Sequence, residues 1–405
     1  MKGLGRIAIA GGGIGGLTAA LALLRRGVNV TVFEQAPELK EVGAGLQLSP
    51  NGLRALYKLG LEEPLLRAAC EPSGKEIRLW NTGQTWNLFD LGASAVQQYG
   101  YPYLMMYRPD LHTILAEAIQ RLSPEALVLG ARCTGFTQDD HEVRVKLADG
   151  REFSSDVLVG ADGVHSTIRT QLFGADQAEY SGCVAWRGVI PMADLPNHLS
   201  RPVGTNWIGP GAHVIHYPLH GGDLMNFVGI VEKDSWIDES WTQEGTHEDM
   251  RTDFHGWHAD VHALIDRIRV PYKWALMLRR PLPRWTSGRV TLLGDAAHPT
   301  LPFLAQGAVM AIEDGYVLAQ AIASAEGSTS ECLHAYERSR IERTTRIVEK
   351  SAENGKRFHN RELASAESAG AYVEREWAED KVRSRYDWLF AYDVDRALTD
   401  PVHGG

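Results

Sequence analysis

Three glycines near the start of the chain have the spacing of a turn that binds a pyrophosphate. Gly11, Gly13 and Gly16 follow a short apolar run and precede an Ala/Leu-rich segment, which predicts a buried strand, a tight turn and a helix. In such a turn the first glycine permits the sharp bend, the second lets the backbone approach the phosphates, and the third allows the helix to pack closely on the strand. Ile14 and Gly15 then belong to the first helical turn, whose amides and dipole attract an anion.

Glu34 lies where the next strand is expected to end, about twenty residues beyond the glycines. A carboxylate at this position accepts hydrogen bonds from ribose hydroxyls, so the pattern favours an adenosine ribose without a 2′-phosphate. A glycine-rich turn can also serve packing alone, but here strand, glycines, helix, second strand and acid follow in the order of a βαβ unit that binds a dinucleotide. The motif does not distinguish FAD from NAD.

Two more carboxylates follow apolar runs and are therefore expected at strand ends. Asp162 precedes Gly163, and Asp295 follows Gly294, each after a segment typical of a buried strand. Open α/β sheets bind ligands at the carboxyl ends of their parallel strands. We therefore expect both carboxylates at the side of the sheet that carries the glycine turn. For Asp162-Gly163 the alternative is a capped turn without a ligand.

Two other positions favour ligand contact over simple connection. Gly45 lies in residues 42–52, a loop with more glycines than a connecting turn needs, which indicates close approach of the backbone to a ligand. Arg108 immediately precedes a helix predicted over residues 109–122, where a positive charge gains nothing from the helix dipole. Arg108 therefore either serves a ligand or forms a surface salt bridge.

A second group of strands lacks intervening helices, which predicts a mostly antiparallel sheet in a separate domain. These strands are expected over residues 183–192, 205–219 and 224–232, and residues 76–99 also have a strand-like, aromatic pattern. Within the group, His213 and Tyr217 lie four residues apart, so strand alternation places both on one face with Ile215 between them. The pair could line a pocket, or it could be an interior His and Tyr whose hydrogen bonds are satisfied.

Length, charge and cysteine spacing argue against several classes of protein. A chain of 405 residues exceeds one compact core, so two closely packed domains are expected. The formal net charge of −10 disfavours nucleic acid or an anionic membrane as the main partner. The four cysteines are scattered without a CxxC pair, which predicts neither a metal site nor disulfides and favours the cytoplasm. No segment of the sequence approaches the ~20 apolar residues that span a bilayer.

The motifs at residues 11–16, 162–163 and 294–295 resemble, in order and spacing, those of the single-component FAD-dependent aromatic hydroxylases, the group A flavoprotein monooxygenases. The resemblance covers essentially the whole chain and is greatest to the salicylate hydroxylase and 3-hydroxybenzoate 6-hydroxylase branch. It implies an α/β fold with a Rossmann-like FAD-binding domain, a mostly antiparallel substrate domain and a C-terminal helical segment. The implied ranges are 1–75, 105–180 and 285–360 for the FAD-binding domain, 76–104 and 181–284 for the substrate domain, and 361–405 for the helical tail.

The resemblance also implies roles for the motif residues. The glycine turn would hold the FAD pyrophosphate, Glu34 its adenosine ribose and Asp295 its ribityl chain, while residues 302–308 would border the flavin ring. The pair Asp162-Gly163 would serve both FAD and the pyridine nucleotide. The full set of implied cofactor residues is Gly11, Gly13, Ile14, Gly15, Gly16, Glu34, Gly45, Arg108, Asp162, Gly163, Gly294, Asp295, Gly307 and Ala308.

By the same resemblance, NADH or NADPH would reduce FAD, O2 would form a flavin hydroperoxide, and one oxygen would pass to a phenolic aromatic carboxylate such as salicylate or 3-hydroxybenzoate. His213 would be the catalytic base beside Tyr217, because a neutral histidine can take the phenol proton and make the ring more reactive. Tyr103, Gln47 and Pro302 would belong to the substrate pocket. Hydroxynicotinate enzymes carry His in place of Gln47, and some 3-hydroxybenzoate enzymes carry Gln in place of Pro302, so these two departures leave the particular substrate open.

Other functions also stay open from the sequence. A 6-hydroxynicotinate-type hydroxylase is an alternative within the family. A flavin oxidase or dehydrogenase would use oxygen only to reoxidise the flavin, and a flavin-binding sensor or interaction module would have no turnover. The expected partners are a small aromatic substrate and O2, in a monomer or homodimer, without nucleic acid, membrane or metal.

Overall fold

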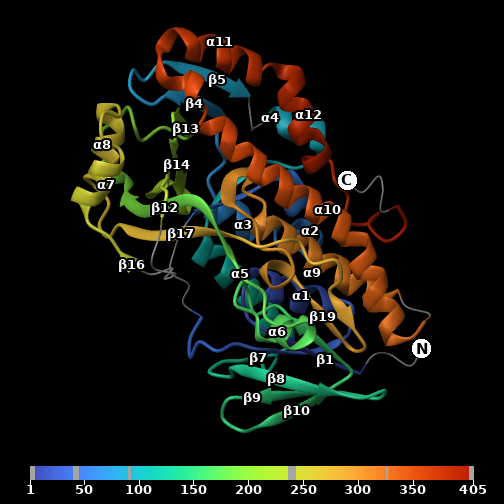
Figure 1. Cartoon of the computed structure of the whole chain (residues 1–405). Coiled ribbons are helices and arrows are strands. Elements are labelled where there is room, and N and C mark those ends of the chain that lie inside the picture. The colour runs from blue at the N-terminus through green and yellow to red at the C-terminus, as the bar shows by residue number, and fades with distance from the viewer. Residues whose placement is uncertain (1–4, 40–44, 90–92, 236–242, 325–326, 401–405) are drawn as a thin grey trace.

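The computed structural model describes residues 5–39, 45–89, 93–235, 243–324 and 327–400. Residues 42–44 of the predicted glycine loop and residues 401–405 of the predicted tail lie outside these ranges. Two large sheets occupy the lower part and the upper left of Figure 1, and the long helix α10 (Thr329–Phe358) extends from one toward the other. The combination of a Rossmann-like sheet, a mostly antiparallel sheet and C-terminal helices confirms the predicted fold class.

The first sheet contains the predicted βαβ unit. Its strand order is β18-β19-β11-β1-β2-β7, and all neighbours pair in parallel except β18. The bounds are β1 Arg6–Ala10, β2 Asn29–Phe33, β7 Leu127–Val128, β11 Val157–Gly160, β18 Thr286–Ser287 and β19 Val290–Leu292. Because β1, β11 and β19 are neighbours, the glycine turn, residues 162–163 and residues 294–295 follow the carboxyl ends of adjacent strands, as the sequence predicted.

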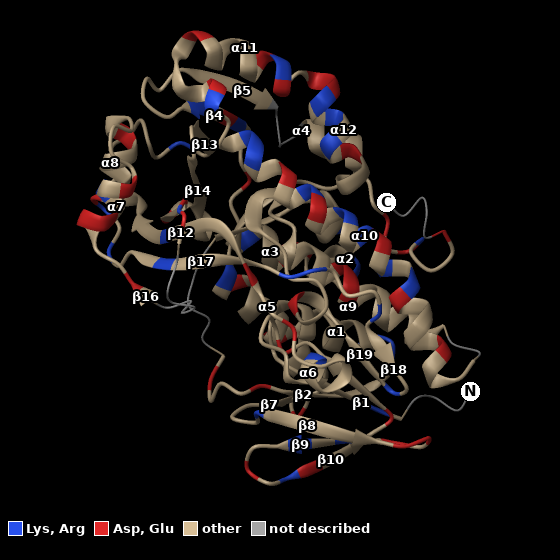
Figure 2. Cartoon of the chain, in the orientation of Figure 1, with Lys and Arg blue, Asp and Glu red and all other residues tan. Residues whose placement is uncertain are grey.

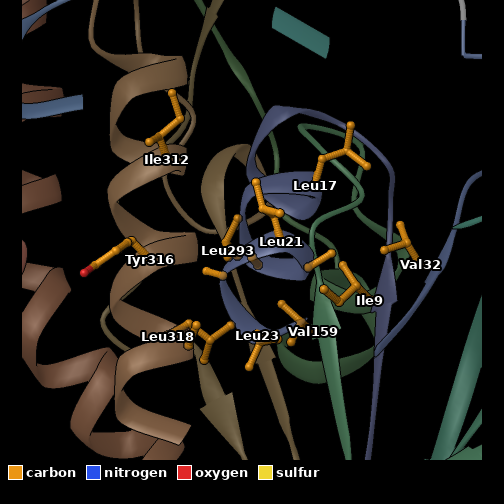
Figure 3. Packing of buried hydrophobic residues seen from close by; sticks show 14 of the residues in the cluster. Ile9, Leu17, Leu21, Leu23, Val32, Val159, Leu293, Ile312, Tyr316 and Leu318 are labelled. Atoms are coloured by element: carbon orange, nitrogen blue, oxygen red, sulfur yellow. The ribbon is translucent and has the colours of Figure 1, made fainter. Parts of the chain in front are cut away.

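Helices α1 (Ile14–Leu24) and α9 (Gly307–Ala323) pack against each other beside this sheet. Figure 3 shows Leu17 and Leu21 of α1 among Ile9 and Val159 of the strands, with Ile312 of α9 on the other side. All five side chains are fully buried. Burying an apolar side chain of this size contributes about 1.5–3 kcal/mol to folding. The packing of α1 and α9 beside the strands is therefore a major source of stability.

The second sheet has the order β16-β17-β12-β15-β14-β13-β4-β5 and is antiparallel except between β4 and β13. Its strands are β4 Lys75–Leu79, β5 Thr85–Phe89, β12 Glu179–Pro191, β13 Gly204–Gly209, β14 Ala212–Leu219, β15 Leu224–Glu232, β16 Gln243–Glu244 and β17 Tyr272–Leu278. The predicted strand over 205–219 is therefore two strands. They meet at a turn in which Gly211 has a φ of 72°, a conformation that favours glycine.

The strand-like prediction over residues 76–99 is wrong at its end. After β4 and β5 the chain forms helix α4 (Ala93–Tyr99). The alternation of the two strands does not continue there, and Gln97 and Gln98 are good helix formers. Local propensity thus outweighs the aromatic content that suggested a strand.

The remaining elements surround the two sheets. The other helices are α2 Pro50–Lys58, α3 Glu62–Ala68, α5 Arg108–Leu122, α6 Thr167–Phe173, α7 His247–Asp253, α8 Ala259–Ile265, α11 Ala366–Glu376 and α12 Glu379–Phe390. A meander of β8 (Cys133–Gln138), β9 (Val143–Leu147) and β10 (Glu152–Ser155) lies at the bottom of Figure 1, and β3 (Gly45–Leu48) pairs with β6 (Leu104–Tyr107). The division into three residue ranges stays a prediction.

Charged residues of both signs alternate along α10, α11 and α12, as Figure 2 shows. The strands at the centre of the first sheet carry almost none, which agrees with their burial. Among the helices of the described ranges, none is long and apolar enough to cross a membrane. Within the same ranges no group of three or more His, Cys, Asp or Glu side chains is arranged to hold a metal ion.

Candidate active site

A cavity of about 350 Å³ lies between the glycine turn of the first sheet and strand β14 of the second. The predicted site residues that line it are Gly13, Ile14, Gly15, Gly16, Gly45, Gln47, Arg108, Gly163, His213, Tyr217, Gly294, Asp295, Pro302, Gly307 and Ala308. Four other predicted site residues, Gly11, Glu34, Tyr103 and Asp162, are not among the residues that line it. The fold thus brings together residues from six segments that are distant in sequence.

The three glycines of the turn differ in what surrounds them. Gly11 has a φ of 108°, which only glycine adopts readily. A Cβ atom on Gly16 would lie 2.1 Å from the carbonyl oxygen of Gly11, so this position permits the helix to approach the strand. A Cβ on Gly13 would meet nothing within 4 Å. Gly13 therefore leaves open space in front of the first amides of α1, which fits a pyrophosphate at a helix N-terminus.

Glu34 fixes the shape of the turn from behind. Its carboxylate accepts hydrogen bonds from the backbone amides of Gly12 at 2.7 Å and Ala36 at 2.8 Å. Nε2 of His112, on α5, lies 2.6 Å from the carbonyl oxygen of Gly12 and holds the other side of the same residue. His112 was not among the predicted site residues, since nothing in its local sequence indicates this contact.

A second helix N-terminus borders the cavity. Helix α9 has 17 residues and begins at Gly307 and Ala308, which both line the cavity wall. Asp295 and Pro302 lie in the two short turns between β19 and this helix. The positive end of the α9 dipole therefore faces a space that also receives the N-terminus of α1, and an anionic ligand is favoured at both places.

A buried ion-pair network supports α9 from the side away from the cavity. Glu313 pairs with Arg340 at 2.6 Å and with Arg343 at 2.8 Å, and Asp314 pairs with Nε of Arg340 at 2.7 Å. Burial alone would raise the pKa of Glu313, but the charges of Arg343 and Arg340 hold that pKa below its ordinary value. We refer to these four side chains, which are at most 3% exposed, as the α9 ion network.

The α9 ion network also reaches the strand-end turn. Asp314 accepts a hydrogen bond from the amide of Gly294 at 3.1 Å, and Nε2 of His298 lies 2.6 Å from the same carboxylate oxygen. Asn51 of α2 donates to Glu313 at 2.7 Å. The network therefore ties the Gly294-Asp295 turn, α2, α9 and α10 into one rigid support.

Asp162 is directed away from the cavity. Its carboxylate accepts from the hydroxyl of Ser166 at 2.5 Å and from the amides of Thr167 at 2.8 Å and Ile168 at 3.2 Å, at the start of α6. Gly163, the next residue, lines the cavity with its backbone. The carboxylate is thus in the capping arrangement that the sequence left open as an alternative.

The opposite wall of the cavity is formed by β14. His213, Ile215 and Tyr217 all line it, as strand alternation predicted. His213 is fully buried, and its Nδ1 lies 2.7 Å from Nε2 of His359. Its Nε2 has no hydrogen-bond partner among the described residues. Burial, with His359 beside it, lowers the pKa of His213 well below its ordinary value, so the ring is neutral.

Tyr217 belongs to a short chain of polar groups. Burial raises its pKa, and its hydroxyl is hydrogen-bonded to Gln47. Gln47 Oε1 in turn accepts a hydrogen bond from the hydroxyl of Tyr103 at 2.5 Å. Tyr103 was predicted to line the substrate pocket, but it lies behind Gln47 and packs against Phe390 of α12, with ring centroids 5.9 Å apart. Its contact with the cavity is therefore indirect.

Several contacts of the site were not predicted from the sequence. His359 follows the last residue of α10, and Glu232, which ends β15, accepts from it at 2.9 Å. Asn226 of β15 accepts a hydrogen bond from the amide of Gly45 at 2.9 Å. These residues occur singly, in segments without a motif, so only the tertiary structure reveals them.

Two helix N-termini and an unobstructed glycine turn on one cavity are the features of a dinucleotide-binding protein. The FAD binding domain model matches residues 6–351, so the chain belongs to this family and the predicted cofactor, FAD, is confirmed. The predicted resemblance to the FAD-dependent aromatic hydroxylases is also confirmed, and the chain is a flavin-dependent monooxygenase of that group.

Characterised relatives cover almost the whole chain. The 3-amino-4-hydroxybenzoate 2-monooxygenase of Streptomyces platensis is 40% identical over 354 residues, 87% of this chain and 88% of its own. The 3-hydroxybenzoate 6-hydroxylase of Polaromonas naphthalenivorans (strain CJ2) is 37% identical over 397 residues, 97% of each chain. A solved salicylate hydroxylase substrate complex aligns with a TM-score of 0.80 at 27% identity and covers 100% of this chain and 99% of its own.

Proposed function

We propose that this protein hydroxylates the ring of a phenolic aromatic carboxylate, with NADH or NADPH as the reductant and O2 as the oxidant. The observation that carries the proposal is that the fully buried His213 lines the cavity beside Tyr217, with no hydrogen-bond partner for its Nε2 among the described residues. A neutral imidazole nitrogen in this position can accept the phenol proton. The resulting phenolate ring is more electron-rich and reacts better with an electrophilic oxygen.

The residues that would hold FAD lie at the first-sheet side of the cavity. The amides of the first turn of α1, with Gly13 in front of them, would bind the pyrophosphate, and Glu34 would meet the adenosine ribose. Asp295 would hold the ribityl chain, and the start of α9 at Gly307 would lie at the ring. When bound, FAD supplies the activation of O2, and the positive end of α9 favours its anionic reduced form.

The substrate side suits a flat ring with polar substituents. Ile215, Val228, Ile230 and Phe303 provide apolar surface, while His213, Tyr217 and Gln47 provide polar groups on the same wall. Ligand pockets of this kind combine a mainly apolar lining with a few placed polar groups. The relatives named above act on 3-amino-4-hydroxybenzoate, 3-hydroxybenzoate or salicylate by their names, and each of these acids carries a phenol and a carboxylate.

The remaining residues support binding rather than chemistry. The capping carboxylate of Asp162 would order α6 and the adjoining Gly163 backbone, and Arg108 would contact FAD from the start of α5. We place the enzyme in the cytoplasm as a monomer or homodimer, since scattered cysteines and a pyridine-nucleotide reductant suit that compartment.

The function is tested by isotope labelling. Holoenzyme is incubated with NADH or NADPH, ¹⁸O2 and each of 3-hydroxybenzoate, 3-amino-4-hydroxybenzoate, salicylate and 6-hydroxynicotinate, and products are analysed by mass spectrometry. We expect ¹⁸O in the product of at least one of the three phenolic acids, and none from the methyl ether of the same acid. Oxidation of the nucleotide without ¹⁸O in any product would favour a flavin oxidase or dehydrogenase instead.

His213→Ala tests the assigned base. Product formation should fall by about 10²–10⁴, the usual contribution of a positioned general base, while FAD content is unchanged. His216→Ala is the matched control, because His216 is equally buried on the same strand but does not line the cavity. If His213→Ala retained the wild-type product yield per nucleotide oxidised, His213 would have no role in proton removal.

A further inference from the structure

Three side chains connect the interior cavity to the protein surface. Nδ1 of His213 lies 2.7 Å from Nε2 of His359, and Nδ1 of His359 lies 2.9 Å from a carboxylate oxygen of Glu232. The three come from β14, from the residue after α10 and from the end of β15. Their exposed fraction rises along this series of hydrogen bonds, from 0% for His213 to 3% for the side chain of His359 and 57% for that of Glu232. We call these three side chains the histidine relay.

The protonation states of the relay follow from its outer end. The Glu232 carboxylate can only accept, so Nδ1 of His359 carries the hydrogen. Burial lowers the pKa of His359 although Glu232 opposes this, and a neutral His359 then presents Nε2 as an acceptor. Nδ1 of His213 must therefore donate to it. In a neutral His213 this leaves the lone pair on Nε2, which has no hydrogen-bond partner among the described residues.

The two ends of the relay open onto different spaces. His213 lines the cavity assigned to the substrate. Glu232 lines a separate surface depression together with Gly211 and Lys233. Between them, the rings of Phe303 and Phe358 pack against His213 with centroid distances of 5.6 Å and 5.0 Å. These apolar rings flank His213, whereas His359 offers its ring a polar contact that continues to Glu232.

We propose that His213, His359 and Glu232 carry the substrate's phenolic proton from the cavity to solvent. This rests on the proposed function. The phenol O–H bond breaks and its proton binds Nε2 of His213, while the Nδ1 proton of His213 passes to Nε2 of His359. The Nδ1 proton of His359 passes to the Glu232 carboxylate, which releases it to water. The phenolate keeps the electron pair, and reverse transfer along the same atoms restores the starting tautomers when the product takes up a proton.

The relay solves a problem that burial creates for a lone base. A protonated imidazole is strongly disfavoured at the position of His213, because the site is desolvated and His359 lies beside it. If each histidine gains one proton as it loses another, neither ring has to hold a full charge after the transfer. His359 and Glu232 act through His213 and are therefore positioning and proton-transfer residues, whereas His213 touches the substrate.

A purely structural reading is that the relay only ties the end of α10 to the second sheet. His359→Gln separates the two readings, because an amide can accept from His213 and donate to Glu232 but cannot pass a proton on. The structural reading predicts normal proton release from this variant. The relay predicts its loss.

The experiment measures proton release when the oxidised FAD holoenzyme binds each of 3-hydroxybenzoate, 3-amino-4-hydroxybenzoate and salicylate, in weak buffer with a pH indicator in a stopped-flow instrument. The ultraviolet absorbance of the phenolate is followed in parallel. We expect fast release of one proton per bound phenol from the wild type. In His359→Gln the rate should fall by about 10² or more, with binding affinity and FAD content retained. Glu232→Gln should cause a smaller loss, since water in the surface depression can substitute for the last acceptor.

The controls keep the outcomes distinct. His216→Gln carries the same substitution on the same strand outside the relay and should release the proton at the wild-type rate. Glu232 is largely exposed, so Glu232→Gln provides a folded test even if His359→Gln does not fold. Wild-type proton-release rates in both relay variants would overturn the relay while leaving the hydroxylase function intact. Absence of labelled product from every phenol in the wild type would instead overturn the proposed function, and the relay with it.

Discussion

The α9 ion network and the histidine relay are both buried polar clusters, yet they differ in how completely they are paired. In the network, two carboxylates and two guanidinium groups pair with one another, and none of the four lines the cavity. In the relay, neutral rings form a single line of hydrogen bonds that ends at one side in a nitrogen without a partner in the described part of the chain and at the other in an exposed carboxylate. The completely paired network is therefore suited to support α9, whereas the incompletely paired relay is suited to react with a substrate.

The physical reason is the free energy of desolvation. A buried full charge is tolerated only with close partners, and every carboxylate oxygen of Glu313 and Asp314 has at least one hydrogen-bond partner. A neutral imidazole loses much less on burial and can keep one lone pair free. His213 is therefore suited to react, whereas Glu313 is suited to hold α9 in place.

The largest expected effect comes from breaking the network. Arg340→Met leaves Glu313 and Asp314 buried with fewer cationic partners and should lower the free energy of unfolding by about 3–5 kcal/mol. Urea unfolding of the holoenzyme, followed by circular dichroism, measures the change. The relay should be affected only as far as the whole protein loses stability.

Arg67→Met is the matched control for that prediction. Arg67 pairs with Glu63 on α3, but both side chains are more than two-thirds exposed, at 68% and 81%. Its loss should change the free energy of unfolding by no more than about 0.5 kcal/mol. Equal changes in the free energy of unfolding would show that the buried ion pairs of Arg340 contribute no more to stability than an exposed ion pair.

A second, intermediate effect tests whether buried histidines of the second sheet are neutral. Burial lowers the pKa of His216 to about 3, with Arg78 and Arg201 lowering it further and Glu76 and Asp260 opposing them. In the unfolded chain a histidine has a pKa near 6.5. The unfolded state thus binds the proton first, so the stabilising contribution is complete above about pH 6.5 and is lost as the pH falls.

His216 should therefore cost about 1.6 kcal/mol of stability between pH 6.5 and pH 5. His216→Gln removes one titrating group, so its stability should fall less steeply over this range than that of the wild type. Unfolding midpoints in urea at pH 5, 6 and 7 measure the difference. Parallel pH profiles of the two proteins would mean that His216 is not held neutral by the fold.

The sequence predicted the first sheet better than the second. The residues of the glycine turn, Glu34 and the two strand-end carboxylates lie in short continuous motifs, whose geometry is set by local backbone conformation. His213 and Tyr217 were placed on one face because strand alternation is also local. The relay was missed because His359 and Glu232 are 127 residues apart and each follows an ordinary segment.

Two side chains have hydrogen-bond partners that the sequence did not predict. Tyr103 was expected in the pocket, but it lies behind Gln47 of β3, which accepts a hydrogen bond from its hydroxyl. Asp162 was expected to face ligands, but the start of α6 offers its carboxylate two backbone amides and a hydroxyl. Competing hydrogen bonds decide which way a side chain at the end of a strand points. The order of residues does not reveal those hydrogen bonds.

The smallest expected effect distinguishes the two side chains that the substrate would meet on β14. Tyr217→Phe removes one hydroxyl and keeps the ring, while Gln47 retains its hydrogen bond from Tyr103. An ordinary hydrogen bond is worth about 1 kcal/mol, so kcat/KM should fall about fivefold, with no change in FAD content and little loss of coupling between nucleotide oxidation and hydroxylation. Tyr103→Phe, one step farther along the same polar chain, should have a still smaller effect, because its hydroxyl acts only through Gln47. Steady-state kinetics and product yield per nucleotide oxidised measure both variants. A loss in Tyr217→Phe as large as that in His213→Ala would assign proton removal to the tyrosine, and the unpaired nitrogen of His213 would then no longer mark the reactive end of the histidine relay.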